Sequence, residues 1–131
     1  MTTSTHTNLK TELTFPGVLP GNNGSKGLLR MHWAARNKLR DQFTWLVRSL
    51  TKNKHAGKVK LQLIRYHAGI SMDYDNLVST GKLIVDSIVL ANVIIDDKES
   101  IIAQRDYRQV KVKTKGEQKT VIIIEDLSCG T

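Results

Sequence analysis

The residues with the clearest chemical potential are aspartates near the middle of the chain. Asp73 and Asp75 belong to the run DYDN at positions 73–76, and the pair Asp96-Asp97 follows later in the sequence. Carboxylate oxygens are the hard ligands that Mg²⁺ and Mn²⁺ prefer, together with water and phosphate oxygens. Alternate residues of an extended segment point the same way, so Asp73 and Asp75 could hold one ion together. We therefore expect a divalent-metal site, which Asp97 can join if the chain doubles back.

A lysine and a further aspartate extend this set. Lys82 lies two helical turns beyond Asp75, and Asp86 follows Lys82 by four residues. An ammonium group at this place could contact a scissile phosphate or stabilise the charge that develops on it. The structural alternative is an i, i+4 salt bridge between Lys82 and Asp86, which contributes a few tenths of a kcal/mol. The structural alternatives for the aspartates are a helix N-cap at 75–76 and a polar turn at 96–97.

The distribution of charge indicates a polyanionic partner. The chain carries a net charge of +8, and its isoelectric point is about 9.8. The window from Asp73 to Glu99 contains six of the twelve acidic residues but two of the twenty basic ones, so it carries −4 and the remainder carries +12. A metal-dependent nuclease needs such a division, because basic residues attract phosphates while carboxylates hold a cation at the scissile one.

Four segments have the composition and alternation of strands, namely residues 9–15, 58–66, 105–114 and 119–126. In the first, Thr11 and Leu13 fall on the side expected to face the core, with Leu9 and Phe15. The residues between the last two segments, 115–117, read KGE and have the chemistry of a turn. We therefore expect the last two strands to pair as a hairpin.

Two segments have helical periodicity, at about 32–50 and 76–92. The apolar stripe of the first contains Ala35, Leu39, Phe43, Leu46 and Leu50. The second has Leu77, Ile84, Ile88 and Ala91 on one side, and Asp75, Ser79, Lys82 and Asp86 on the other. We expect Trp33 and Trp45 to lie in the core or in an interface, with Trp33 the better candidate for a DNA contact.

This order predicts one α/β domain over residues 1–131, of the two-layer α+β kind. Its elements follow as β-α-β-α-β-β, with a mixed sheet and both helices on one face. We expect 1–7 and 127–131 to be loose tails and 17–27 to be a loop. The sequence has no apolar export segment or membrane span, and Cys129 is its single cysteine, so we expect a cytoplasmic protein.

The motifs together resemble the RusA family of Holliday junction resolvases, which are crossover junction endodeoxyribonucleases. The resemblance rests on DYDN at 73–76, on the helix with Lys82 and Asp86 four residues apart, and on the IDD run at 95–97. The first strand with Pro16, the loop containing Asn22-Asn23 and the closing VIIIEDL run fit as well. The similarity covers roughly residues 9–126.

The resemblance implies a homodimeric endonuclease of DNA recombination and repair that depends on Mg²⁺, or on Mn²⁺ in its place, and nicks four-way DNA junctions symmetrically. The metal-binding aspartates of the family correspond to Asp73, Asp75 and Asp97, and its essential lysine corresponds to Lys82. Asp86 and Asp96 are then candidates for orienting Lys82 or metal-bound water.

Two departures from the family concern this same region. About three more residues separate Asn76 from Lys82 than in the best-known members, which is close to one helical turn. The run at 69–72, often rich in arginine in the family, is GISM here. DNA contacts are therefore expected from basic residues elsewhere, namely Arg30, Arg36, Lys38 and Arg40.

Two other functions are compatible with the same residues. A non-catalytic nucleic-acid-binding protein would bind DNA without metal-dependent cleavage, and a protein-interaction module would show no salt-sensitive affinity for DNA. For the nuclease we expect a two-fold dimer, because a four-way junction has two equivalent strands to cut. Trp33, Trp45, Val47 and the run 121–124 offer apolar surface for its interface.

Overall fold

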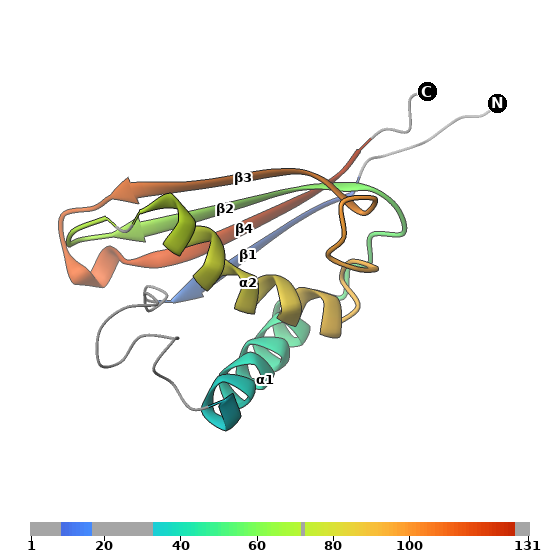
Figure 1. Ribbon diagram of the computed structural model, residues 1–131, viewed down its shortest axis with the longest axis horizontal. Coiled ribbons are helices and arrows are strands. Elements are labelled where there is room, and N and C mark those ends of the chain that lie inside the picture. The colour runs from blue at the N-terminus through green and yellow to red at the C-terminus, as the bar shows by residue number, and fades with distance from the viewer. Residues whose placement is uncertain (1–8, 17–32, 72, 128–131) are drawn as a thin grey trace.

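A computed structural model describes residues 9–16, 33–71 and 73–127 of the chain. In these residues four strands form one sheet, and two helices cover one of its faces (Figure 1). The strands are β1 (Lys10–Pro16), β2 (Val59–His67), β3 (Ile102–Lys111) and β4 (Lys119–Asp126). The helices are α1 (Trp33–Leu50), α2 (Tyr74–Leu90) and the short 3₁₀ helix η2 (Lys115–Glu117).

The sheet is mixed, and its strands lie in the order β1-β4-β2-β3. β4 is antiparallel to both β1 and β2, whereas β3 runs parallel to β2. The prediction of an α+β fold with a mixed sheet is therefore confirmed. The turn at η2 also lies where the KGE run predicted it, between β3 and β4.

The predicted hairpin of the last two strands is wrong, because β2 lies between β3 and β4. The burial of the side chains on β3 and β4 explains why these two strands are not neighbours in the sheet. Val121, Ile122 and Ile124 of β4 are all buried, so this strand suits a central position, where it pairs along both edges with β1 and β2. β3 exposes most of its side chains and occupies the edge.

The parallel pair β2 and β3 needs a long connection, which α2 supplies by crossing back over the sheet. Gly81 allows this helix to lie directly on the strands. A Cβ atom built at Gly81 would lie 2.8 Å from Cδ1 of Leu63 and 3.1 Å from Cε2 of Tyr107. The glycine is thus required by a close approach between helix and sheet.

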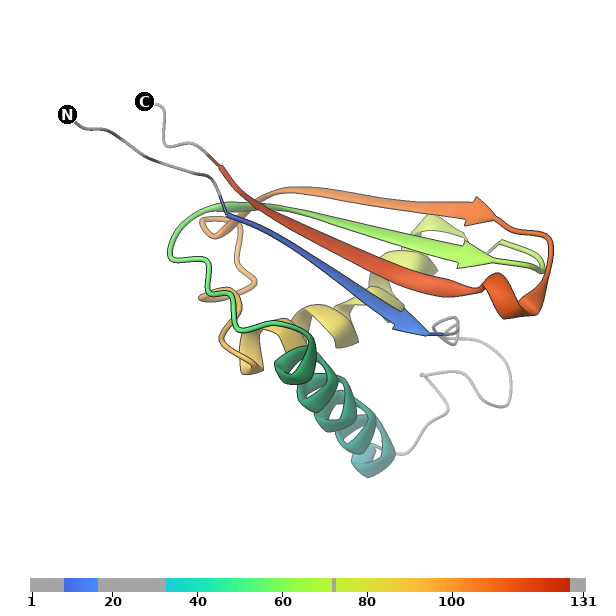
Figure 2. The same ribbon diagram turned by 180° about the vertical axis from the view of Figure 1, so that it is seen from behind.

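The core fills the space between the sheet and the helices, which both views place on the same side (Figure 2). The inward side chains of β2 are buried at every second position, as the alternation predicted. Phe43 of α1 meets Phe15 of β1 edge to face, with ring centroids 5.6 Å apart. The largest side chains that are almost fully buried are Phe15, Leu13, Leu61, Leu63, Leu77, Ile84, Ile88, Ile94, Ile102, Ile122 and Ile124.

Phe43 and Leu46 of the predicted stripe of α1 pack against the core, as expected, but the stripe is incomplete at its end. Trp45 is 71% exposed and Leu50 47% exposed, so neither belongs to the core of the chain, while Val47 is fully buried. α1 also contacts α2, where Ser87 donates a hydrogen bond from Oγ to the carbonyl oxygen of Arg40 at 3.1 Å. Val47 belongs to the core cluster between the helices and the sheet, although it was not part of the predicted stripe.

Several predictions concern the ends of the chain and the loop after β1. The tail at 1–7 and the loop at 17–27 lie outside the described residues, as does the tail at 127–131 apart from Leu127, whose N–H donates to Lys58 O at 3.0 Å. Within the described part of the chain, no helix is both long and apolar enough to cross a membrane.

Candidate functional site

The predicted metal ligands Asp73 and Asp75 lie at the start of α2. The N–H of Leu77 donates to the carbonyl oxygen of Asp73 at 3.0 Å, so the helical bonds begin at Asp73, and Asp75 lies in the first turn. Both residues are exposed. A negative charge is favourable there, because it meets the positive end of the helix dipole. Since Asp75 is already helical, the expectation that both side chains project from an extended segment is wrong.

The end of α2 turns the chain back toward the middle of the helix. Asn92 has a φ of 65°, and its N–H donates to Val89 O at 2.9 Å while the N–H of Val93 donates to Ile88 O at 3.1 Å. These are the two bonds of a Schellman motif, with asparagine in the left-handed position that ends the helix. Val93 and Ile94 are then buried, which fixes the segment that leads to Asp97.

Lys82 lies between two carboxylates as a result. Its Nζ is 3.2 Å from Oδ2 of Asp97 and 3.4 Å from Oδ1 of Asp86. The hydrogen bond to Asp97 is the main reason why the pKa of Lys82 is raised above its ordinary value. The same hydrogen bond is the main reason why the pKa of Asp97 is lowered. The i, i+4 pair predicted for Lys82 is present, and Asp97 adds a second partner from outside the helix.

The backbone at Asp97 is held by two neighbours. Its N–H donates to Oδ1 of Asp96 at 2.7 Å, and the guanidinium of Arg105 donates to its carbonyl oxygen. Asp96 thus orients the loop rather than contacting Lys82. Sequence reasoning missed Arg105, because no local pattern relates a residue on β3 to the loop before it.

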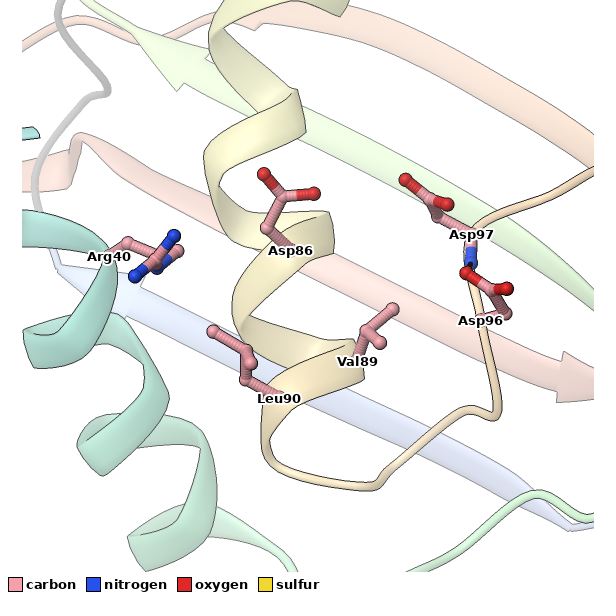
Figure 3. A pocket seen from close by; sticks show the side chains of 6 residues that line it. All are labelled: Arg40, Asp86, Val89, Leu90, Asp96 and Asp97. Carbon is pink, nitrogen blue, oxygen red and sulfur yellow. Dashed lines mark hydrogen bonds between the residues drawn. The ribbon is translucent and has the colours of Figure 1, made fainter. Parts of the chain in front are cut away.

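A pocket of about 240 Å³ adjoins this cluster. Its lining residues are Arg40, Asp86, Val89, Leu90, Asp96 and Asp97. Asp86 projects from α2 between Arg40 on α1 and Asp97 on the following loop (Figure 3). The pocket therefore presents carboxylates opposite a guanidinium, an arrangement that can bind both a cation and a phosphate oxygen.

The structure does not bring the three predicted metal ligands together. Asp97 contacts Lys82, and about 10 Å of helix axis separates Lys82 from Asp75. Among the described residues, no group of three or more His, Cys, Asp or Glu side chains is placed to hold a metal ion. Asp73, Asp75 and Asp97 therefore stay predicted ligands.

Of the four residues predicted to bind DNA, the structure describes the side chains of Lys38 and Arg40. Arg30 lies outside the described residues, and Arg36 is in α1 with a side chain that the structure does not describe. Lys38 is exposed on α1. Arg40 reaches the pocket, and its Nη2 is 3.6 Å from Oδ1 of Asp41.

A second polar cluster, also missed from the sequence, surrounds the buried His55. Its Nδ1 is 2.6 Å from Oδ1 of Asp126, and its Nε2 is 2.7 Å from Oγ1 of Thr11. Asn53 Nδ2 also donates to Thr11 Oγ1, at 3.0 Å. The order of hydroxyl, imidazole and carboxylate is that of a hydrolytic triad. Because Thr11 is 2% exposed, no substrate can reach its hydroxyl, and the cluster joins β1, β4 and the segment before β2.

The chain matches no family model, and no curated protein matches it.

Proposed function

We propose that the chain is a structure-selective endodeoxyribonuclease that resolves four-way (Holliday) DNA junctions, as do members of the RusA family that its motifs resemble. One observation carries the proposal. Lys82 is held between Asp86 and Asp97 on an exposed side of α2, and the DYDN run at 73–76 spans the start of the same helix. The resemblance depends on these residues, and the fold places three of them in contact.

Lys82 is the proposed contact to the scissile phosphate. The two carboxylates keep its ammonium charged and limit its orientations, so its charge can stabilise the negative charge that develops as water attacks phosphorus. The oxygen of water bonds to phosphorus, the bond from phosphorus to one sugar oxygen breaks, and the proton that water gives up ends on the departing sugar oxygen. Asp97 holds Lys82 directly, and Asp96 and Arg105 support Asp97 through its backbone.

Mg²⁺ is the proposed cofactor, with Mn²⁺ as a substitute, and this part of the proposal rests on the resemblance. Asp73, Asp75 and Asp97 remain the proposed ligands, although they do not form one group in the described structure. Dependence on added metal is therefore measured directly in the experiment below.

A homodimer is proposed because two equivalent strands of a junction must be cut. Of the residues expected at its interface, Val121, Ile122, Ile124 and Val47 are buried within the chain and cannot supply it, whereas Trp45 remains exposed. The side chain of Trp33 lies outside the described structure. Sedimentation at micromolar concentration should give about twice the chain mass of 14.7 kDa. A monomer that still cuts both strands in a coordinated way would contradict the dimer.

The test is incubation of the purified protein with labelled four-way junctions, with Mg²⁺ and with EDTA. We expect paired nicks that require Mg²⁺. Asp75→Asn should lose cleavage yet bind the junction as well as the wild type or more tightly, because one negative charge near the DNA is removed. Glu99→Gln, at an exposed site in the same acidic window, is the matched control and should cleave normally. Wild-type nicking by Asp75→Asn would refute this role for Asp75.

A second candidate is a non-catalytic nucleic-acid-binding protein on the same fold. The observation that favours it is the lack, among the described residues, of a group of carboxylates placed to hold a metal ion. Salt-sensitive binding of junctions without any Mg²⁺-dependent nick would support this candidate over the nuclease. A protein-interaction module would give neither binding nor cleavage.

A further inference from the structure

The end of β3 and the turn after it carry a concentration of basic side chains. From Arg105 to Lys119 the chain has six basic residues and two acidic ones. Lys111, Lys113 and Lys115 are all exposed, and none of them forms an ion pair with another described residue. Arg108, in contrast, is paired with Asp106. The three lysines, called the lysine cluster below, therefore present uncompensated charge.

The lysine cluster lies at the same end of the sheet as the start of α2. The N–H of Val112 donates to His67 O at 2.8 Å, and the N–H of Ala68 donates to Gln118 Oε1 at 3.1 Å. These bonds tie the segment around the lysines to the end of β2, from which the chain leads to Asp73. Both views show the tip of β3 and η2 beside the start of α2 (Figures 1 and 2).

β3 links the lysine cluster to the candidate site. It is an edge strand, and it begins near the loop that carries Asp97, whose carbonyl oxygen accepts from Arg105. Gly81 holds α2 against Leu63 of β2 and Tyr107 of β3, so this strand runs beneath the helix that carries Lys82. Basic groups on β3 thus extend from the side of Asp97 to the end of the sheet where Asp73 and Asp75 lie.

We propose that the lysine cluster binds the phosphate backbone of a DNA arm next to the candidate site. This inference rests on the proposed function and specifies where the substrate lies. Lys111 ends β3, Lys113 lies in the bend that follows, and Lys115 begins η2, so all three exposed charges lie close together along the chain at this end of the sheet, where one strand of phosphates can meet them. The side chains are exposed and line no described pocket, which suits a long polyanion better than a small anion.

The test compares two triple variants with equal loss of charge. Lys111→Gln/Lys113→Gln/Lys115→Gln removes the lysine cluster. Lys52→Gln/Lys54→Gln/Lys58→Gln removes three exposed lysines from the connection between α1 and β2, near the opposite end of the sheet. Binding to a labelled four-way junction is measured in EDTA over a series of salt concentrations. Loss of the lysine cluster should weaken binding at low salt and reduce the slope of log affinity against log salt by about 2 to 3, whereas the control should keep the wild-type slope.

The outcomes separate this inference from the proposed function. An equal loss in both triple variants would overturn the role of the lysine cluster and leave the nuclease intact. A selective loss in a protein that never cuts would support the lysine cluster and refute the nuclease. A wild-type protein that binds vesicles of anionic lipid through these lysines but no DNA would overturn both. If the triple variant unfolds at a lower temperature, Lys113→Gln and Lys115→Gln, both outside the strand, are compared singly with Lys54→Gln.

Discussion

The ammonium nitrogen of Lys82 lies 3.2 Å from Oδ2 of Asp97, although fifteen residues separate them in the sequence. The contact exists because α2 ends in a left-handed Asn92, after which the buried Val93 and Ile94 direct the chain back along the helix. A residue in the middle of a helix is thereby joined to the loop that follows it. Each group changes the pKa of the other in the direction that favours its charged form.

Lys82→Met should abolish cleavage without harming the fold. Removal of a charge that stabilises a transition state typically costs about a hundredfold or more in rate. The Lys82 side chain is 64% exposed, so its ion pairs contribute about 0 to 1 kcal/mol to stability. Single-turnover nicking and thermal unfolding measure the two effects. Lys98→Met, at an exposed lysine beside Asp97, is the control, and equal nicking by the two variants would rule out a catalytic role for Lys82.

Asp97→Asn should lower stability in a pH-dependent way. The lowered pKa of Asp97 means that its stabilisation is present above the ordinary value of 3.8 and is lost as the pH falls through the folded-state pKa. The raised pKa of Lys82 means that the same pair stabilises below 10.5 and is lost as the pH rises through the folded-state value.

Urea unfolding of Asp97→Asn and wild type tests this pH dependence. The two proteins should differ by at most about 1 kcal/mol near neutral pH, because the pair is exposed. The difference should disappear in strong acid. A difference that persists there would mean that Asp97 acts through something other than its charge.

Gly81→Ala should destabilise the protein by about 1 kcal/mol. Alanine favours a helix over glycine by about 1 kcal/mol, but overpacking a core costs about 1 to 3 kcal/mol. The added methyl would stand 2.8 Å from a side-chain atom of Leu63, which is fully buried. Gly57→Ala, where nothing lies within 4 Å, is the control for denaturant unfolding. An increase in the stability of Gly81→Ala would show that the helix moves freely away from the strands.

His55→Leu should lower the free energy of unfolding by about 2 kcal/mol or more. The substitution leaves Asp126 and Thr11 without their imidazole partner, and a buried polar group that loses its partner costs about 1 to 3 kcal/mol. Thr11→Val should lower the free energy of unfolding less in the His55→Leu protein than in the wild type, because Thr11 and His55 share one hydrogen bond that His55→Leu has already removed. Lys54→Leu, exposed one position away, should change stability by about 0.5 kcal/mol or less. Strict additivity of the first two substitutions would contradict the shared bond.

The sequence predicted the positions of the helices and strands better than it predicted which strands pair in the sheet. Alternation and helical spacing located all four strands and both long helices, because these patterns reflect which side of a segment meets the core. The partner of a strand depends on contacts far along the chain, so the hairpin of β3 and β4 was wrong. In the candidate site, too, contacts between residues close in sequence were predicted, and contacts between distant segments were not. The i, i+4 pair of Lys82 and Asp86 is local and was predicted, whereas Arg105 and the partners of His55 come from distant segments.

The position of β4 has a consequence for the order in which the chain can fold as it is synthesised. The β2-α2-β3 unit is continuous in sequence, so it can form once Lys111 has emerged from the ribosome. β1 is made long before it, yet its strand partner in the described sheet is β4, which begins at Lys119. The first strand therefore leaves the ribosome without a partner, and the sheet closes when β4 inserts between two segments that were made earlier.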